Sequence, residues 1–375
     1  MASGPLQGLK VIEFAGIGPG PFCGMLLSDM GADILRIERK GADAGRDPRV
    51  EIDRRGRSSV SLDLKRPESV AACLALCEKA DVLFEGYRPG VMERLGLGPD
   101  AALERNPRIV YGRMTGWGQH GPYAPRAGHD INYIAITGAL HAIGTKGKPV
   151  PPLNLVGDYG GGAMMLAVGL LSAVLHARAT GQGQVVDASI SDGTSYLTAI
   201  FYRLRALGQW QEERAANLLD GGAPFYDTYR CADGRFVAIG AIEPQFYALL
   251  LEKMGLAGKL RHDQMDRAAW PAMKATFAEV FASKTRDQWV EIMGDADTCF
   301  APVLTAQEAA HDPHNIARST FVEIDGIRQP APAPRFSHTP GAIQASGTGA
   351  AVREVLQSWG LSASHVGELV DAAEA

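Results

Sequence analysis

The segment Gly128-His-Asp-Ile-Asn-Tyr133 holds the residues best suited to acid–base chemistry. A histidine takes up and releases a proton near neutral pH, and His129 follows a glycine in what we expect to be a loop between two regular elements. Catalytic groups are often found in such loops. A histidine beside an aspartate is also common without any function, so His129 and Asp130 mark a candidate site that needs support from elsewhere in the sequence.

Two further carboxylates lie next to predicted helix starts. Asp158 belongs to a glycine-rich segment just before a helix that we expect over 160–177, and an aspartate in that place is also a good N-cap. Glu243 follows an expected strand over 236–242 and precedes a proline at a helix start, where a negative charge favours the helix dipole. Each carboxylate therefore has a structural explanation beside a catalytic one, and the local pattern leaves both open.

The basic residues form the next group of interest. The formal net charge is -5, from 37 Lys+Arg and 42 Asp+Glu, which excludes a generally basic protein that binds nucleic acid. Most surface basic residues meet only water, but several on the loops of one sheet can form a pocket for a phosphorylated small molecule. The residues near expected strand ends are Arg36, Arg39, Lys40, Arg54, Arg55, Arg57, Lys65, Arg66, Arg88 and Arg94.

Several familiar motifs are broken or absent. Segment 16–24 follows an expected strand and opens a helix, as a dinucleotide fingerprint does, but Pro21 stands where the third glycine is needed. Prolines also remove amide donors for a pyrophosphate, so a tight strand-to-helix turn explains the segment better than NAD or FAD binding. No Gly-x-Ser-x-Gly elbow and no Walker A loop occurs, which disfavours a hydrolase triad and phosphoryl transfer. His311 and His314 have no further ligand nearby in the sequence, so we expect no metal site.

Cysteine usage and the chain ends bear on location. The five cysteines are irregularly spaced without a Cys-x-x-Cys motif, so we expect a reducing compartment with no disulfides and no zinc module. Met1–Lys10 is not a secretory signal and Val370–Ala375 is not a peroxisomal one. The apolar stretch Ala163–Leu175 is too short to span a bilayer. We therefore expect a cytoplasmic protein that associates with no membrane.

The hydrophobic pattern predicts the elements that must position these residues. Strands alternate with helices in the first half of the chain, which is typical of an α/β fold with a parallel sheet. The expected strands cover 9–14, 32–37, 58–64, 81–84, 109–114 and 184–189, and the helices cover 22–30, 67–80 and 160–177. Further on we expect a long helix over 194–207, a hairpin over 226–242, helices over 245–254, 270–282, 286–293 and 306–310, and terminal helices over 352–359 and 363–369. Gln329–Pro334 alternates proline with small residues and is expected to be a stiff linker.

Eight short segments give the sequence a family resemblance. They are 16–20 (GIGPG), 62–65 (LDLK), 85–90 (EGYRPG), 112–118 (GRMTGWG), 128–133 (GHDINY), 151–158 (PPLNLVGD), 219–224 (LDGGAP) and 240–245 (GAIEPQ). Together they resemble the α-methylacyl-CoA racemase branch of the family III CoA-transferase superfamily. Each segment is weak alone, but their order over residues 5–336 makes the resemblance specific.

The resemblance implies an architecture as well as an activity. It implies a Rossmann-like large domain over 1–190 that binds CoA and is rejoined by 335–375, and a smaller α+β domain over 220–328. Residues 191–219 would connect the two domains, and 329–334 would lead the chain back. It further implies an interlocked homodimer, with each active site between the large domain of one chain and the small domain of the other.

The implied chemistry is the racemisation of 2-methylacyl-CoA thioesters at the α-carbon. The α-proton is only weakly acidic, so a two-base 1,1-proton transfer through an enolate needs acid–base groups on both faces and help for the enolate oxygen. By resemblance His129 and Asp158 form the pair, and Glu243 orients His129 from the other subunit. We expect the amides of Asp158 and of its glycine neighbours, at a helix start, to serve the enolate oxygen. No metal, nicotinamide or flavin cofactor is implied, because acyl-CoA is the substrate.

The resemblance also assigns residues to substrate binding. Met164 and Met165 are candidates for the acyl-chain surface, although a plain core role is the simpler explanation. The preferred acyl chain, whether branched fatty, sterol side-chain or aryl-propionyl, stays open. The residues expected to contact CoA are Arg39, Leu62, Asp63, Leu64, Lys65, Gly86, Tyr87, Arg88, Arg94, Gly128, Asp130, Ile131, Asn132 and Tyr133.

Two alternatives remain from the sequence. A CoA-transferase of the same superfamily would move CoA between carboxylic acids through an anhydride on Asp130, which stands where such a nucleophile belongs. The glutamine expected further along the transferase motif is missing, so we expect Asp130 to serve CoA binding instead. A regulatory protein that binds CoA without catalysis is the other alternative, and the joint presence of His129, Asp158 and Glu243 argues against it.

Overall fold

The computed structural model describes residues 3–39, 47, 49–260, 262–346, 350–364 and 366–367. The chain divides into two compact units, which we call the large unit (1–137, 152–198 and 317–375) and the small unit (138–151 and 199–316). The domain limits expected from the sequence stay a prediction. The units differ from them in two ways: 138–151 and 199–219 are grouped with the small unit, and 191–198 and 317–328 with the large unit. Lys40 and the segment Val370–Ala375 lie outside the described residues.

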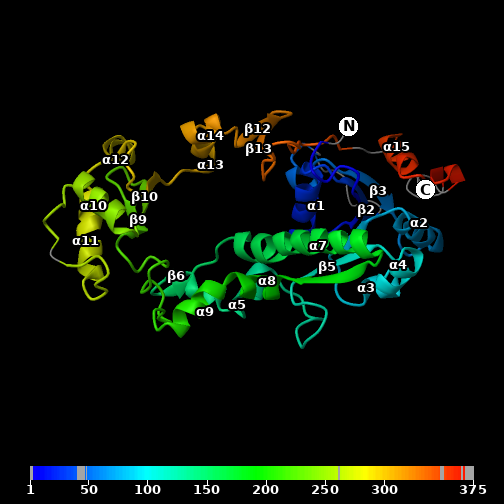
Figure 1. Ribbon diagram of the computed structural model, residues 1–375, viewed down its shortest axis with the longest axis horizontal. Helices are drawn as coiled ribbons and strands as arrows, with labels where there is room; N and C mark the ends of the chain where they lie inside the picture. The colour runs from blue at the N-terminus through cyan, green and yellow to red at the C-terminus, as the bar shows by residue number, and fades with distance from the viewer. Residues whose placement is uncertain are drawn as a thin grey trace. The chain divides into compact units, whose positions relative to one another are not determined.

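A parallel sheet forms the centre of the large unit, with β2, β3 and β5 labelled in Figure 1. Its six strands follow the order β3-β2-β1-β4-β5-β8. Every neighbouring pair is parallel, with Ile12 opposite Leu35 where β1 meets β2. The expected α/β class with a parallel sheet is confirmed. The strands are β1 (Lys10–Phe14), β2 (Asp33–Arg39), β3 (Ser58–Leu62), β4 (Val82–Glu85), β5 (Val110–Thr115) and β8 (Gln184–Ser189).

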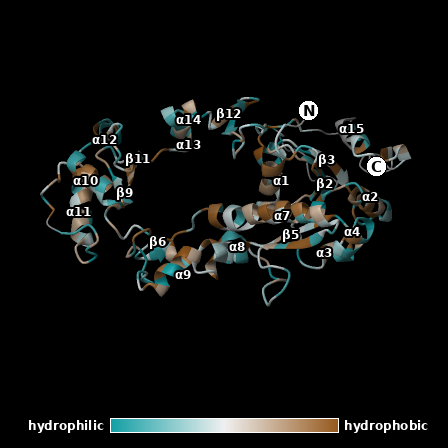
Figure 2. Ribbon diagram, in the orientation of Figure 1, coloured by the Kyte–Doolittle hydropathy of each residue, from teal (hydrophilic) through white to brown (hydrophobic). Residues whose placement is uncertain are grey.

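Helices cover both faces of this sheet. The helices α1 (Pro19–Asp29) and α7 (Met164–Thr180) share one apolar cluster with side chains such as Val11 and Val110, and Figure 2 shows hydrophobic residues along both helices. The opposite cluster contains Ile12 and Tyr111 and is covered by α2 (Pro67–Cys77), α4 (Pro99–Arg105) and α15 (Ala350–Ser358). Successive strand side chains point to opposite faces, so the apolar residues of each strand pack into both clusters.

The helix expected over 160–177 is longer and less regular than its sequence indicated. It begins as a π-helix, η2 (Leu155–Ala163), and continues without a break into α7. The 26-residue helix over 155–180 is long and apolar enough to cross a membrane by length and composition, so the expectation of a stretch too short for this was wrong. Half of its most apolar window is buried inside the protein, as in a core helix packed on β5 and β8.

The long helix expected over 194–207 is two helices, α8 (Ile190–Leu197) and α9 (Ala199–Ala206). The first begins early because the Ser189 hydroxyl caps it, accepting a hydrogen bond from the N–H of Asp192 at 3.2 Å. At the break the Thr198 hydroxyl donates to the carbonyl of Ser195. The large unit ends this stretch at Thr198, and α9 belongs to the small unit.

The small unit is built on the expected hairpin. The strands β9 (Tyr226–Arg230), β10 (Phe236–Gly240) and β11 (Phe300–Pro302) form an antiparallel sheet in the order β11-β10-β9. The helices α10 (Pro244–Lys253), α11 (Trp270–Phe281) and α12 (Arg286–Met293) pack on an aromatic core that includes Phe225, Phe277 and Trp289. Short elements complete the unit: α6 (Ala139–Ala142), β6 (Gly144–Thr145), β7 (Lys148–Pro149) and α13 (Ala306–Ala309).

The segment expected to be a stiff linker begins inside a hairpin. The strands β12 (Phe321–Ile324) and β13 (Ile327–Pro330) pair antiparallel, so the predicted linker start at Gln329 was wrong. The Gln329 side chain is buried because its Oε1 accepts a hydrogen bond from Arg55 at 2.7 Å. This contact fastens the returning chain to the large unit.

Candidate active site

The carboxyl ends of the parallel strands surround a cavity of about 450 Å³ in the large unit. Its walls are the turns that follow β1, β4 and β5, together with the segment before α5 (Asp130–Ala135) and one residue of η2. Ligands of open α/β sheets bind at this edge because the loops there lie between strand ends and helix starts. The cavity brings together Arg88, His129, Tyr133 and Asp158 from the sequence-based assignments.

His129 stands at the N-cap of α5, so the prediction of a loop over 128–133 was wrong from residue 130 onwards. Its backbone is extended, and its N–H donates to Oδ1 of Asn132 at 3.1 Å. The Asn132 side chain thereby satisfies a backbone donor just outside the helix, which explains why the helix begins there. The exposed imidazole of His129 lines the cavity.

Asp158 lies inside the π-helix η2 and not at an N-cap, which corrects the structural alternative drawn from the sequence. Burial and the nearby charge of Asp130 raise the pKa of its half-buried carboxyl group, against a hydrogen bond from Asn154 and the charge of His129. The backbone N–H of Asp158 donates to Oδ2 of Asp130 at 2.7 Å. The expectation that this amide serves an enolate oxygen was therefore wrong, because it already has an acceptor.

An aromatic wall beside His129 was missed by sequence reasoning. The rings of Trp117 and Tyr133 meet edge to face with centroids 4.7 Å apart, and the Tyr133 hydroxyl donates to the carbonyl of Gly128. A Cβ on Gly116 would lie 2.0 Å from the Tyr133 ring, so only glycine lets the turn after β5 pass so close. The signal in the sequence was the gathering of Trp117, Tyr123 and Tyr133 around the histidine.

Several basic residues expected in an anion pocket lie in the protein interior. Arg36 contacts Glu13 and Glu38, and all three side chains are almost fully buried. Arg57 lies 3.2 Å from Glu13, while Arg55 pairs with Asp29. Buried arginines with carboxylate partners hold elements together and are not available to a ligand. The expectation for Arg36, Arg55 and Arg57 was wrong, and Arg54 likewise reaches Glu38.

Arg88 and Arg126 are the arginines that line the cavity within the described part of the chain. Arg88 was expected from the sequence, whereas Arg126 was missed. Its guanidinium lies 4.6 Å from the centroid of the Tyr123 ring, a cation–π contact that holds it at the cavity. An arginine two residues before Gly128 was the available signal.

The residues assigned to CoA binding divide into two sets. Gly86, Tyr87, Arg88, Gly128 and Tyr133 line the cavity. The side chain of Leu62 is wholly buried in the core, so only the backbone of Leu62 could contact CoA. The second set does not contribute to this cavity among the described residues: Arg39, Leu62, Asp63, Leu64, Lys65, Arg94, Asp130, Ile131 and Asn132.

Glu85 fixes the turn that carries Tyr87 and Arg88. Its Oε2 accepts a hydrogen bond from the N–H of Tyr87 at 2.6 Å, and Arg113 approaches Oε1 at 3.4 Å. Burial at the end of β4 nevertheless raises the pKa of Glu85 to about 7. The carboxyl group that shapes this turn therefore titrates near neutrality.

Glu243 belongs to the small unit. It is exposed at the N-cap of α10, where its charge lies at the favourable end of the helix dipole. Burial and then the charge of Glu243 raise the pKa of the thiol of Cys299, which follows the turn before β11. Across the residues that the structure describes, no group of three His, Cys, Asp or Glu side chains could hold a metal ion.

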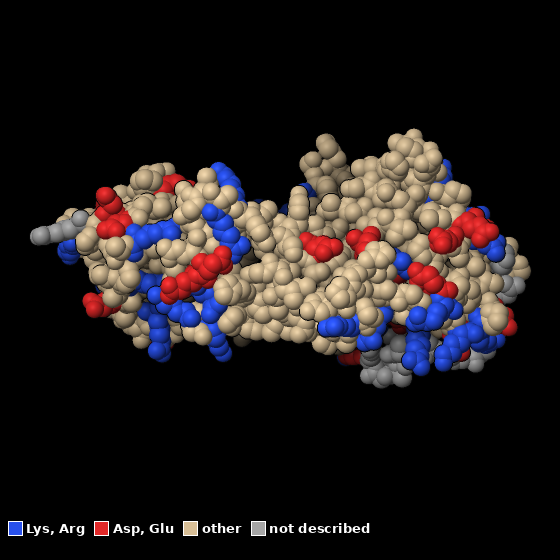
Figure 3. Space-filling model, turned by 90° about the horizontal axis from the view of Figure 1, so that it is seen from below, with Lys and Arg blue, Asp and Glu red and all other residues tan. Residues whose placement is uncertain are grey.

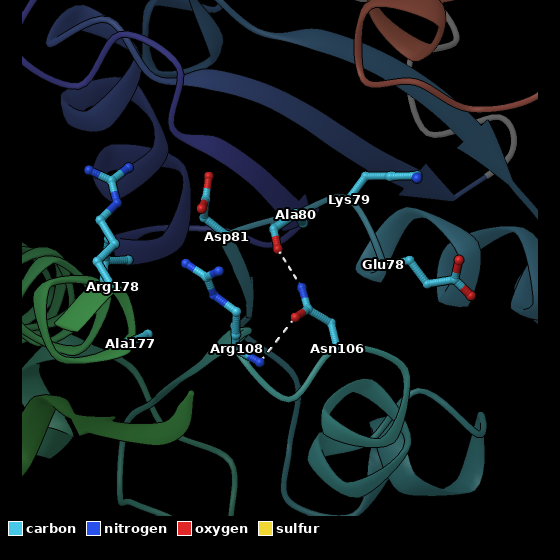
Figure 4. Close-up of a pocket in the computed structure, with 9 residues that line it drawn as sticks. Glu78, Lys79, Ala80, Asp81, Asn106, Arg108, Ala177 and Arg178 are labelled. Carbon is cyan, nitrogen blue, oxygen red and sulfur yellow. Dashed lines mark hydrogen bonds between the residues drawn. The ribbon is translucent and has the colours of Figure 1, made fainter. Parts of the chain in front are cut away.

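A second cavity, of about 290 Å³, lies at the amino ends of β4 and β5 (Figure 4). The Asn106 amide group donates to the carbonyls of Cys77 and Ala80, and its Oδ1 accepts from the N–H of Arg108. The N–H of Lys10 donates to Asp81. The side chains of Asn106 and Asp81 in this cavity thus complete hydrogen bonds of the fold.

The surface charge is mixed. On the face of each unit drawn in Figure 3, basic and acidic side chains are interspersed. Such a surface differs from the single-signed patch that a nucleic-acid-binding protein presents.

The sheet order, the glycine-rich turns and the His–Asp cavity define an α/β protein with a candidate ligand site at the carboxyl edge of its sheet. The chain belongs to CoA-transferase family III, whose family model matches residues 6–347. It is similar to α-methylacyl-CoA racemase of Mus musculus, with 45% identity over 97% of this chain and 96% of that protein. The Homo sapiens protein of the same name is 43% identical over the same shares. Among solved structures, a hypothetical protein from Mycobacterium tuberculosis is 27% identical, with a TM-score of 0.78 over 94% of this chain and 99% of that one.

Proposed function

We propose that this protein racemises 2-methylacyl-CoA thioesters at the α-carbon. The observation that carries the proposal is the placement of His129 and Asp158 in the lining of one cavity, on separate elements of the large unit. The similarity to two α-methylacyl-CoA racemases over nearly the whole chain supports the same reaction.

The two groups divide the proton transfer between them. One takes the α-proton, the C–H electron pair moves toward the thioester carbonyl to give an enolate, and the other returns a proton to the opposite face. His129 is the base in one direction and Asp158 in the other. A carboxyl group whose pKa is raised by burial exchanges protons more readily near neutral pH, so the environment of Asp158 suits both roles.

Substrate binding follows from the charge and polarity of the cavity. We assign the phosphates of CoA to exposed basic residues at the carboxyl edge of the sheet, among them Arg88, which lines the same cavity as His129 and Asp158. Met164 is 43% exposed and so is not a core residue as expected, and it offers an adaptable apolar surface to the acyl chain. No cofactor is needed, because the thioester supplies the acidifying group.

The proposal includes a homodimer. Glu243, exposed on the small unit, would reach His129 of a second copy and orient its imidazole. Exposed apolar side chains on α7, α8 and α9, such as Val168, Tyr196 and Ile200, suit a large interface between copies. Light scattering tests the proposed dimer, and a mass of two chains is the expected result. We also propose a location in the cytoplasm, which localisation of a tagged chain would test.

The test is proton NMR of one enantiomer of a 2-methylacyl-CoA, incubated with the protein in D₂O beside a chiral assay. Loss of the α-proton signal together with loss of optical purity is the expected result. The matched control is R178A, which removes a guanidinium at the opposite edge of the sheet. If the α-proton does not exchange and optical purity is kept, the proposal is contradicted.

The same experiment decides the transferase alternative. The chain is 31% identical to the β subunit of a succinyl-CoA–L-malate CoA-transferase from Chloroflexus aurantiacus. This similarity supports the transferase alternative. The Asp130 carboxylate, however, is buried and accepts a backbone hydrogen bond, which disfavours attack on a thioester. Transfer of CoA to an added carboxylic acid, with conversion of Asp130 to its hydroxamate by hydroxylamine during turnover, would establish the alternative.

A further inference from the structure

Asp130 connects two segments of the candidate site that are distant in the sequence. Its Oδ2 accepts a hydrogen bond from the backbone N–H of Asp158 at 2.7 Å. The residue is only 9% exposed, and Oδ1 has no hydrogen-bond partner among the described residues. A buried carboxylate with so few donors is unfavourable, since water no longer solvates its charge. Its place beside the reacting groups, with one backbone donor bound to it, indicates a role that a neutral apolar residue would not fill.

The packing around this carboxylate is close. Asp130 is the first residue of α5, which contacts η2. A Cβ on Gly157 would lie 2.2 Å from Oδ2 of Asp130, a distance at which something must shift. Only glycine therefore allows the π-helix to approach the carboxylate closely enough for the amide of the next residue to bond to it.

We propose that Asp130 is a positioning residue that couples the two acid–base groups of the site. Its backbone directly follows His129, and its carboxylate holds the backbone of Asp158, so one residue fixes the spacing of both. This inference rests on the proposed racemase function. It gives Asp130 neither the covalent role of a transferase nucleophile nor the direct CoA contact expected from the sequence.

The charge of Asp130 also acts on Asp158. Burial and then this charge raise the pKa of Asp158. The other ionisable groups at this part of the cavity are His129, whose charge lowers that pKa, Tyr133 on α5 and Arg88 after β4. Removing the charge while keeping the hydrogen bond should therefore lower the pKa of Asp158, which gives the proposal a signature in the pH profile.

Three variants separate position from charge. D130N keeps an oxygen that can accept the amide hydrogen bond and removes the charge, whereas D130A removes both. G157A changes no ionisable residue, but its added Cβ forces the Asp130 carboxylate away from the Asp158 amide. In D130N we expect kcat for α-proton exchange within about fivefold of the parent and an acidic limb about one pH unit lower. In D130A and G157A we expect kcat to fall about 10- to 100-fold with little change in KM.

A second readout does not depend on catalysis. Hydrogen–deuterium exchange of the Asp158 amide should be slow in the parent and in D130N, and fast in D130A and G157A. If the parent fails to exchange the α-proton of a 2-methylacyl-CoA, the proposed function fails, while amide protection still decides whether Asp130 holds this segment.

Two outcomes would overturn the proposal. The first is an unchanged rate and an unchanged Asp158 amide in D130A. The second is a D130N that loses as much activity as D130A while its Asp158 amide stays protected, which would give the Asp130 oxygen a chemical role. Should D130A fail to fold, D130N and G157A still decide between these outcomes.

Discussion

The two ends of the parallel sheet of the large unit carry cavities of opposite character. At the carboxyl ends, Arg88 from the turn after β4, His129 from the N-cap of α5 and Asp158 from η2 line the cavity. At the amino ends, Asn106 and Asp81 line a smaller cavity, but their polar atoms bond to backbone groups of the fold. Similar residue types therefore do different work at the two ends of the same strands.

The direction of the helices explains the difference. The helices α1 and α5 begin at the carboxyl edge, so the positive ends of their dipoles face that cavity. The helices α2 and α7 end at the amino edge, where Arg178 lies in the last turn of α7 and Figure 4 shows it at the cavity. An anionic substrate is favoured at the first edge, whereas at the second edge basic side chains complement the negative helix ends. The comparison teaches that location at a strand end, more than residue type, separates a binding site from a structural one.

The largest expected effect is at the carboxyl edge. H129A and D158A should each lower the racemisation rate by about a thousandfold, because each removes one of two proton carriers. Calorimetry should show CoA binding within about threefold of the parent, since neither side chain is assigned to phosphate. A rate within tenfold of the parent in either variant would show that the pair is misassigned.

The next effect compares one arginine at each edge. R88A should raise KM for the acyl-CoA by roughly tenfold, the value of a lost charge-assisted hydrogen bond, with kcat less affected. R178A should leave both constants unchanged. Steady-state kinetics at two salt concentrations should also show a weaker salt dependence in R88A. Equal KM changes in the two variants would remove the distinction between the edges.

A pH effect on stability should arise from Glu85, which burial holds at a pKa of about 7. Its folded pKa lies above the ordinary value of 4.5. The stability that the protonated Glu85 confers is therefore fully present below pH 4.5 and is lost as the pH rises from there through about 7. Relative to E85Q, the parent should lose about 3 kcal/mol of unfolding free energy over this window. Urea unfolding at several pH values measures this difference. Parallel pH curves for both proteins would contradict the assignment.

The smallest expected effect on activity is at the amino edge. N106A removes hydrogen bonds to the carbonyls of Cys77 and Ala80 and to the N–H of Arg108. The free energy of unfolding should fall by about 1–3 kcal/mol because buried backbone groups lose their partners. The rate of α-proton exchange at a temperature where the variant is folded should match the parent, and a tenfold loss would mean that this edge also takes part in the reaction.

The sequence predicted the sheet well and the electrostatics poorly. Alternating apolar strands and helices are a local pattern, so the strands were located to within a few residues. The family motifs brought out His129 and Asp158, which the structure places in one cavity. The burial of Arg36 was not visible, because its partner Glu13 stands opposite it only through the register of β1 and β2. Ion pairs across a sheet depend on contacts between distant residues, which no local window contains.

The π-helical start of η2 has a consequence for how the site can change in evolution. A π-helix behaves as an inserted residue in an α-helix, and here the insertion lies between Asp158 and the core-facing side of α7. Deleting one of the glycines over 160–162 would relax the backbone to ordinary helical winding. It would also turn Asp158 by about 100° about the helix axis relative to α7. The π-helical turn thus sets the angle between two parts of one continuous helix. It lets α7 pack on the sheet while Asp158 still faces the cavity.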